Sequence, residues 1–346
     1  LVATKAARVV HAAEGHPVSD FGLRRAQGPD GGLAVARASY IGGAGSTSNV
    51  LAGKVYGIPV FGTHAHSWVM AFPNELDAFR AFAKSSPKNC VLLLDTYDVH
   101  QGIRNAIVVA KEMEAAGERL AAVRIDSGDL AKLSKEARGA FDAEGLDYVR
   151  ISVSNDLDEY TIQSLFAQGA PIDSFGVGTK LATCDPQPSL GGVYKLSATR
   201  PTAGDPWEPV IKLSEMAYKR TIPGVQSVRR FFDASGCPVG DMICDESAQG
   251  DPGTQMVDVL DDLASYDLSG LESRELLVQL VDGGEPLPAS EGIEEAKARC
   301  REALMRLDPA VRRFLNPQGY PVGLELGLAR LRRELATREL MGSGRK

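Results

Sequence analysis

The sequence predicts an α/β protein in which a β/α barrel is followed by a smaller α/β extension. Along the first half of the chain, short apolar runs that end in polar residues alternate with helical patterns. The alternation stops at a segment rich in Pro and Gly, residues 198–207, and an antiparallel pattern follows it. We therefore place a barrel domain at residues 1–197 and the extension at residues 198–346.

The apolar runs of the first half predict parallel strands whose carboxyl ends lie on one face, where barrel enzymes place their active sites. The first run, 57–67, ends with His64 and His66. Acidic, hydroxyl or glycine residues end the later runs, which are 90–98, 121–129, 148–156 and 172–179. Helical patterns precede, separate and follow these strands at 3–13, 75–84, 103–116, 130–144 and 157–168.

The second half has a different pattern. It predicts a hairpin of strands 225–232 and 237–244, a strand at 276–281, and helices at 292–307 and 323–338. The start of the chain is also unusual, because Leu1 is not a methionine and the helical pattern at 3–13 has no strand before it. We expect that an N-terminal portion is missing.

Composition narrows the functional class. The net charge of -7 argues against general nucleic-acid binding. No apolar run is long enough to span a membrane, and the chain does not begin with a signal segment. The five cysteines are odd in number and lack CxxC spacing, so we expect reduced thiols and neither disulfides nor a zinc site. These features predict a cytoplasmic enzyme that binds neither nucleic acid nor membranes.

Seven segments carry polar, aromatic and glycine residues in a fixed order. They are residues 20–32, 62–67, 94–98, 124–129, 154–156, 175–179 and 187–195. Together they resemble nicotinate phosphoribosyltransferases, from Leu1 to about Gly224 and more loosely to the end of the chain. The resemblance implies an irregular β/α barrel of the type II phosphoribosyltransferase kind. It also implies that family members begin with further residues that this chain lacks.

The activity implied by the resemblance is ATP-coupled transfer of phosphoribose from phosphoribosyl pyrophosphate to nicotinate. The products are nicotinate mononucleotide and pyrophosphate in NAD salvage, with Mg²⁺ as cofactor and a homodimer as the common assembly. The family motif assigns a phosphohistidine to His66. A histidine is suitable for this role because a neutral imidazole can attack a γ-phosphoryl group. An arbitrary histidine is more often a hydrogen-bonded structural group, and we treat His64 as such a neighbour.

Further residues are assigned to phosphoribosyl pyrophosphate. Backbone N–H groups at Gly176 and Gly178, with the Thr179 hydroxyl, suit a phosphate, and the resemblance gives Arg24 to the diphosphate. Asp126, which we also treat as catalytic, can accept hydrogen bonds from ribose or hold a water of Mg²⁺. The rest of this polar rim consists of Asp98, Asp129, Asn155 and Asp156, beside Asp95. For Asp129 a helix N-cap is an equally good interpretation.

The nicotinate site is predicted around Arg124, which ends a buried strand and suits a carboxylate together with Thr63. The resemblance gives ring stacking to Phe21. Ser48 stands near the place where a related nicotinamide enzyme has an aspartate, and an uncharged serine would not repel a carboxylate substrate.

Two other interpretations remain open. The pair His64 and His66 resembles the metal ligands of barrel hydrolases. However, the other histidines, His11, His16 and His100, do not lie at predicted strand ends. The second alternative is an inactive or regulatory fragment, which the unusual start of the chain suggests.

Overall fold

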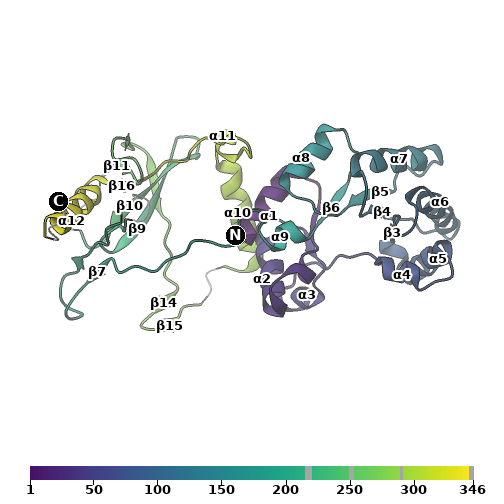
Figure 1. The fold of residues 1–346 in the computed structure, drawn as a ribbon, viewed down its shortest axis with the longest axis horizontal. Coiled ribbons are helices and arrows are strands. Elements are labelled where there is room, and N and C mark those ends of the chain that lie inside the picture. Colours follow the sequence, from purple (N-terminus) through teal and green to yellow (C-terminus); the bar gives the residue numbers. More distant parts are fainter. Residues whose placement is uncertain (215–219, 249–252, 289–290, 343–346) are drawn as a thin grey trace. The chain divides into compact units, whose positions relative to one another are not determined.

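The computed structural model describes residues 1–214, 220–248, 253–288 and 291–342 (Figure 1). It divides into two compact units. Unit 1 comprises residues 1–190 and 291–301, and unit 2 comprises residues 191–290 and 302–346. The domain boundary predicted between residues 197 and 198 stays a prediction.

Unit 1 is built on a parallel sheet of six strands that curls as a half-barrel. The strand order is β2-β1-β6-β5-β4-β3, and each neighbouring pair is parallel. The strands are β1 Val18–Asp20, β2 Ser46–Thr47, β3 Val91–Leu93, β4 Ala122–Ile125, β5 Arg150–Val153 and β6 Ser174–Val177. The predicted α/β class is therefore confirmed, as are the four strands predicted between residues 90 and 179.

Helices cover this sheet and connect its strands. They are α1 Val2–Ala12, α2 Gly28–Ile41, α3 Val50–Tyr56, α4 His66–Met70, α5 Glu75–Ser85, α6 Val99–Ala115, α7 Leu130–Ala143, α8 Glu159–Ala167 and α9 Thr179–Ala182, with short 3-10 turns at Leu23–Arg25 and Pro87–Asn89. The five helices predicted in this half are confirmed. Helix α6 begins four residues earlier than predicted because the Asp98 carboxylate accepts the backbone N–H of Gln101 and caps it.

Helix α6 packs unusually close to strand β3. A Cβ atom added at Gly102 would lie 2.1 Å from the carbonyl oxygen of Leu94, which directly follows the strand. Glycine is therefore required at the first turn of α6, and the approach fixes the backbone on which Asp95 and Thr96 stand.

The strand predicted at 57–67 is wrong. Only a single parallel bridge forms, between Thr47 and Val60. Gly57 ends helix α3 in a left-handed conformation with φ of 73°, and Pro59 has no N–H to donate to a sheet. The chain then leaves the sheet as a loop that carries Thr63 and His64 to the entrance of helix α4.

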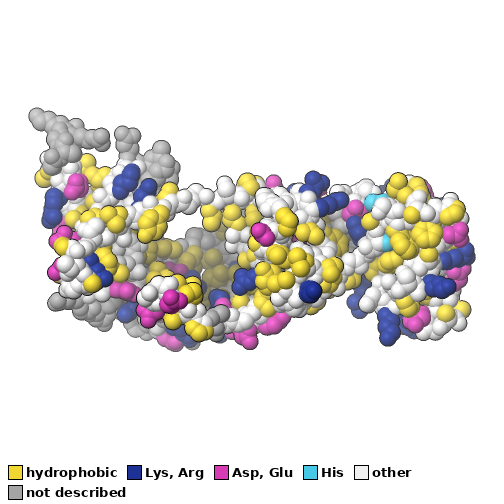
Figure 2. All heavy atoms as spheres, turned by 90° about the horizontal axis from the view of Figure 1, so that it is seen from below, with side chains coloured by type: hydrophobic (Ala, Val, Ile, Leu, Met, Phe, Trp, Pro, Cys, Tyr) yellow, Lys and Arg dark blue, Asp and Glu magenta, His cyan; other side chains and the backbone are white. Residues whose placement is uncertain are grey.

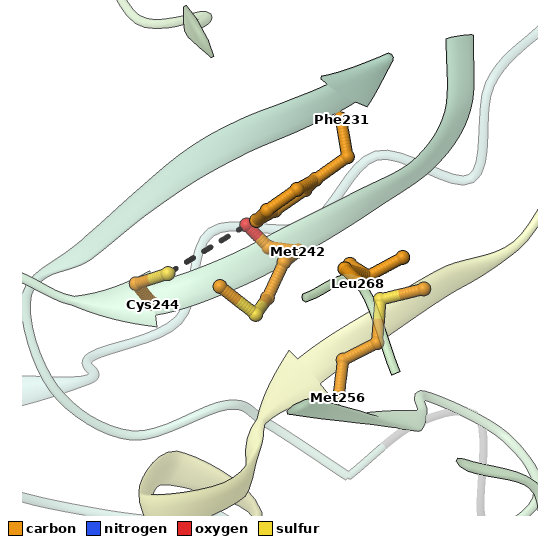
Figure 3. Packing of buried hydrophobic residues seen from close by; sticks show 5 residues of the cluster. All are labelled: Phe231, Met242, Cys244, Met256 and Leu268. Atoms are coloured by element: carbon orange, nitrogen blue, oxygen red, sulfur yellow. Dashed lines mark hydrogen bonds between the residues drawn. The ribbon is translucent and has the colours of Figure 1, made fainter. Parts of the chain in front are cut away.

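Unit 2 is built on a mixed sheet of order β12-β11-β16-β10-β9-β13. Its strands are β9 Gln226–Phe232, β10 Pro238–Asp245, β11 Gln255–Asp258, β12 Ser265–Asp267, β13 Glu272–Glu275 and β16 Val322–Glu325. The pairing of β9 with β10 confirms the predicted hairpin. Side chains from several of these segments form a buried cluster (Figure 3), namely Phe231, Met242, Cys244, Met256 and Leu268.

In the part of the chain that the structure describes, the remaining elements are two short hairpins and three helices. The hairpins pair β7 Ala198–Thr199 with β8 Glu208–Pro209 and β14 Val281–Asp282 with β15 Glu285–Pro286, and the helices are α10 Ile293–Arg306, α11 Pro309–Arg312 and α12 Leu326–Gly342. Helix α10 confirms the prediction at 292–307.

One prediction in this half is wrong. The strand expected at 276–281 does not form, because β13 ends at Glu275 and the apolar side chains of residues 276–278 and 280 are exposed. The helix predicted at 323–338 is confirmed as α12, but it begins three residues later, at Leu326. Leu324 is fully buried in β16, where it pairs with β11, and the strand also pairs with β10. Pairing with two distant strands overrides the helical periodicity of the local sequence.

A buried ion pair joins the first helix of unit 1 to α8. Lys5 Nζ lies 2.5 Å from Glu159 Oε2, with side-chain exposures of 6% and 2%, and Arg8 Nε donates to the same carboxylate at 2.8 Å. Burial raises the pKa of Glu159, but Lys5 and Arg8 lower it more, so that it lies below its ordinary value. The carboxylate is therefore charged at neutral pH.

We expect Lys5→Ala to lower the free energy of unfolding by about 3 kcal/mol, because it leaves a buried carboxylate with one partner fewer. Because the pKa of Glu159 is depressed in the folded state, the stability that this pair contributes is present at neutral pH and is lost as the pH falls through that pKa. Urea denaturation at several pH values measures both effects. The matched control is Lys132→Ala, whose exposed pairing with Glu136 should contribute about 0.5 kcal/mol or less. Equal losses in the two variants would contradict the assignment.

Candidate functional site

Polar groups follow the strands of the unit 1 sheet at its carboxyl edge. Asp95 and Thr96 come just after β3, Asp126 comes after β4, Ser154 after β5 and Gly178 after β6. Because the strands are parallel, these residues share one edge. Contacts between them define a candidate site.

Arg124 is the centre of these contacts. Its Nε donates to Ser154 Oγ at 2.9 Å and its Nη1 to Thr63 Oγ1 at 2.6 Å, while Nη2 lies 3.1 Å from Asp126 Oδ1. Each of the three guanidinium nitrogens thus has one partner in the protein. Its side chain is only 15% exposed, so its charge needs these partners.

Phe21 lies against Arg124. The guanidinium carbon is 5.5 Å from the centroid of the Phe21 ring. A Cβ atom added at Gly176 would lie 2.5 Å from that ring, and the Phe21 backbone N–H donates to Val177 O at 2.9 Å. The absence of a side chain at Gly176 therefore makes room for the Phe21 ring. The sequence motif indicated only phosphate binding for Gly176 and did not indicate this packing role.

Asp126 connects Arg124 to His66. Its Oδ1 accepts a short hydrogen bond from the Ser154 hydroxyl, and its Oδ2 lies 3.7 Å from His66 Nε2. Burial raises the pKa of Asp126, but the Ser154 hydroxyl and Arg124 lower it more, so the pKa lies below its ordinary value. Asp126 is therefore an ionised acceptor at neutral pH.

His66 is the first residue of helix α4, and its side chain is 42% exposed. Its Nδ1 lies 3.2 Å from Thr96 Oγ1. Both ring nitrogens thus have polar neighbours that orient the imidazole, and the exposed part can meet a ligand. A histidine oriented by a hydroxyl and a carboxylate is a suitable nucleophile.

His64 has a different environment. It is 5% exposed, its Nε2 accepts the backbone N–H of Leu93 at 3.1 Å, and its ring centroid is 4.8 Å from that of Phe82. Burial is the main reason that its pKa falls to about 4. His64 is a neutral structural group whose Nε2 lone pair is already used. The described residues also contain no group of three or more His, Cys, Asp or Glu side chains that could hold a metal.

The residues predicted to bind phosphoribosyl pyrophosphate are distributed along the same edge. Thr179 begins the short helix α9 after Gly178, and Asn155 and Asp156 are exposed with positive φ values of 93° and 44°. Non-glycine residues adopt this conformation only at a cost in free energy. Two such residues in succession mark the end of β5 as a constrained turn.

Other predicted residues lie outside the chain of contacts around Arg124. Asp98 and Asp129 are helix caps, and Asp129 accepts the backbone N–H of Lys132 at 3.1 Å. Arg24 is exposed in a 3-10 turn, and the Ser48 backbone N–H donates to Asp20 O at 2.8 Å. Among the described contacts, none joins these four side chains to Arg124.

Sequence reasoning missed two residues of the site. Ser154 was part of a recognised segment, but only the next two residues received a role, and Thr96 stood unused between Asp95 and Tyr97. Hydroxyl groups at the ends of buried strands were the available signal. Asp95, placed in the rim, accepts the Asp126 backbone N–H at 2.9 Å and so supports the turn after β4.

The donors of this edge suit Mg²⁺ only in part. Mg²⁺ is often held by one or two carboxylates together with the phosphates of a substrate. Asp126 offers Oδ2, whereas its Oδ1 is occupied by Ser154 and Arg124. The side chains fit an ion that arrives with a diphosphate, and not one enclosed by the protein.

Comparison with known proteins identifies the family. A model of the "Nicotinate phosphoribosyltransferase (NAPRTase) family" matches residues 17–225, and one of the "Nicotinate phosphoribosyltransferase C-terminal domain" matches residues 225–332. The chain belongs to the nicotinate phosphoribosyltransferase family. The resemblance inferred from its motifs is thereby confirmed, and the metal-dependent hydrolase is not favoured.

Relatives and a solved structure agree with the assignment. Nicotinate phosphoribosyltransferase of Bacillus subtilis is 39% identical over 330 residues, 94% of this chain and 66% of that protein, and the human enzyme is 34% identical over 392 residues, 94% and 70%. The crystal structure of human nicotinic acid phosphoribosyltransferase has a TM-score of 0.80 at 31% identity, covering 97% of this chain and 74% of that one. The chain thus spans about two thirds of the length of these relatives.

The different environments of the two histidines give a stability test. We expect His64→Ala to lower the free energy of unfolding at pH 7 by about 2 kcal/mol, because the buried Leu93 N–H loses its acceptor. His66→Ala, at a half-exposed position, should change it by about 0.5 kcal/mol or less. Urea denaturation of both variants gives the comparison, and a larger loss in His66→Ala would reverse the assignment.

The same histidine predicts a pH dependence. His64 has an ordinary pKa of 6.5 and a folded-state pKa of about 4. The stability that neutral His64 contributes is therefore present above pH 6.5 and is lost as the pH falls from 6.5 towards 4. In His64→Gln, which keeps an acceptor but does not titrate, this part of the pH dependence of unfolding should disappear.

Proposed function

We propose that this chain carries the nicotinate phosphoribosyltransferase site of its protein. The reaction joins the ring nitrogen of nicotinate to phosphoribose and releases pyrophosphate from phosphoribosyl pyrophosphate. The names of the relatives support this class of reaction. Within the site, the observation that supports it best is the Arg124 guanidinium, fixed by three partners beside the Phe21 ring.

Nicotinate is a flat aromatic ring with one carboxylate. A guanidinium suits that carboxylate because it offers paired N–H donors in a plane. The ring would stack on Phe21, and Thr63 and Ser48 would supply polar neighbours without a negative charge. Asp126 already neutralises part of the Arg124 charge, so the site would favour a single carboxylate on the ligand.

Phosphoribosyl pyrophosphate is proposed to bind along the neighbouring strand ends. Gly178 and Thr179 would present N–H and hydroxyl donors to a phosphate, and Arg24 would meet the diphosphate. The acidic and amide groups of this edge would bind ribose hydroxyls or waters of Mg²⁺; they are Asp98, Asp126, Asp129, Asn155 and Asp156. Mg²⁺ would supply charge neutralisation on the diphosphate.

ATP coupling is proposed to act through His66. One ring nitrogen would attack the γ-phosphorus of ATP, with ADP as the leaving group, and the resulting phosphohistidine would be hydrolysed later. Asp126 Oδ2, 3.7 Å from Nε2, can stabilise the imidazolium form of the ring. Thr96 holds the orientation from the other nitrogen.

The homodimer and the cytoplasmic location remain part of this proposal. The described residues include no helix that is long and apolar enough to cross a membrane. In the view of Figure 2, basic and acidic side chains are scattered among apolar areas over the described residues of the face shown, without a continuous basic area. If the chain is instead an inactive fragment, the unaltered protein will form no nicotinate mononucleotide from nicotinate and phosphoribosyl pyrophosphate.

Arg124→Ala tests the nicotinate assignment. A lost charge-assisted contact is worth about 1.5 to 3 kcal/mol, so KM for nicotinate should rise about ten- to a hundredfold. KM for phosphoribosyl pyrophosphate should change far less. Ser48→Asp should weaken nicotinate in the same direction by charge repulsion. The control is Arg150→Ala, an exposed arginine at the amino end of β5, and unchanged nicotinate saturation in the first two variants would refute the site.

His66→Ala tests the ATP coupling. We expect loss of ATP hydrolysis and of its stimulation of product formation, while slow phosphoribosyl transfer remains. Labelling of the unaltered protein with γ-³²P ATP should give an acid-labile, base-stable phosphate that the variant lacks. His100→Ala, an exposed histidine on α6, serves as control. Equal ATPase turnover in His66→Ala would remove this residue from the mechanism.

A further inference from the structure

The hydroxyl of Ser154 lies between two charged groups that the proposed reaction uses separately. Ser154 directly follows strand β5 and is 3% exposed. Its Oγ accepts from Arg124 Nε at 2.9 Å and donates a short hydrogen bond to Asp126 Oδ1. Arg124 Nη2 closes the triangle at 3.1 Å from the same carboxylate oxygen.

The direction of these hydrogen bonds is fixed. Arg124 has no acceptor and an ionised Asp126 has no donor, so the single Ser154 proton must point to Asp126 and a lone pair must face Arg124. The hydroxyl therefore holds the guanidinium from its Nε side. The N–H groups of Nη1 and Nη2 that do not contact Thr63 or Asp126 remain available to a ligand. It also holds Asp126 in the orientation in which Oδ2 faces His66.

We propose that Ser154 is a positioning and specificity-determining residue that couples carboxylate recognition at Arg124 to the pair formed by Asp126 and His66. The inference rests on the proposed function, in which Arg124 binds the nicotinate carboxylate. When the nicotinate carboxylate binds and displaces the Arg124 guanidinium, Ser154 transmits that displacement to the Asp126 carboxylate, which faces His66. A pyridine ring without a carboxylate would not produce that displacement.

Replacing the hydroxyl removes both hydrogen bonds at once. In Ser154→Ala the buried Arg124 Nε–H loses its acceptor, and the guanidinium can turn toward Asp126. We expect KM for nicotinate to rise about tenfold and the preference for nicotinate over nicotinamide to fall by a similar factor, with a smaller change in kcat. Asp126 loses a donor that lowers its pKa, so its titration should move to higher pH.

The chain offers a closely matched control. Ser152 lies two residues earlier, within strand β5, and is 4% exposed, and Ser152→Ala removes a hydroxyl outside the triangle. It should leave nicotinate selectivity and the Asp126 titration unchanged. Ser154→Thr restores a hydroxyl and should recover at least part of the selectivity. If Ser154→Ala does not fold, Ser154→Cys, nearly equal in shape with a much weaker hydrogen-bonding group, takes its place.

Two measurements separate this inference from the proposed function. The first is steady-state kinetics with nicotinate and nicotinamide for the unaltered protein and for Ser154→Ala, Ser152→Ala and Ser154→Thr. The second is carbon-detected NMR titration of the Asp126 carboxyl in the free protein, which needs no turnover. Lack of turnover in the unaltered chain would count against the proposed function alone, while the titration would still test the triangle. An unmoved Asp126 titration in Ser154→Ala would overturn the coupling, and a moved titration with unchanged selectivity would overturn the role in specificity.

Discussion

The permanent charge of Arg124, placed at the end of a buried strand, determines most of the candidate site. A guanidinium with 15% of its side chain exposed must be satisfied by the protein or by a ligand. Three neighbouring segments provide partners: the loop before α4 through Thr63, the end of β5 through Ser154, and the turn after β4 through Asp126. The position of the arginine depends in turn on the parallel pairing of β4 between β3 and β5.

That pairing also explains why the polar groups meet. In register, Arg124 lies beside Leu93 of β3 and Ser152 of β5, so residues one or two positions further along each strand converge at the edge. Hydrogen bonds within the edge then fix the turns that follow the strands. The close approach of Gly102 to Leu94 keeps α6 tight against β3. The site is thus held by elements whose own positions are set by backbone pairing and packing.

The two histidines of the loop before α4 show how burial separates residues that the sequence presents as a pair. His64 is surrounded by Phe79 and Phe82 and accepts a strand N–H, so its lone pair serves the fold. His66, two residues later, lies at the start of a helix with part of its ring exposed. The same side chain is structural in one place and partly exposed in the other, because only the second lies outside the aromatic cluster.

The sequence by itself determined the α/β class, four of the six strands of the first sheet, its main helices and the family. These depend on local periodicity, on a candidate carboxylate cap at Asp129, and on motifs of consecutive residues. Tertiary structure decided the rest. Residues 57–67 do not form a strand although they begin with an apolar run, because the sheet pairs with them only at Val60. Val322–Glu325 is a strand within a helical pattern, because two distant strands pair with it. The contact of Arg124 with Thr63 spans 61 residues and that with Ser154 spans 30. Such contacts arise from strand register and burial, which no single segment of sequence encodes.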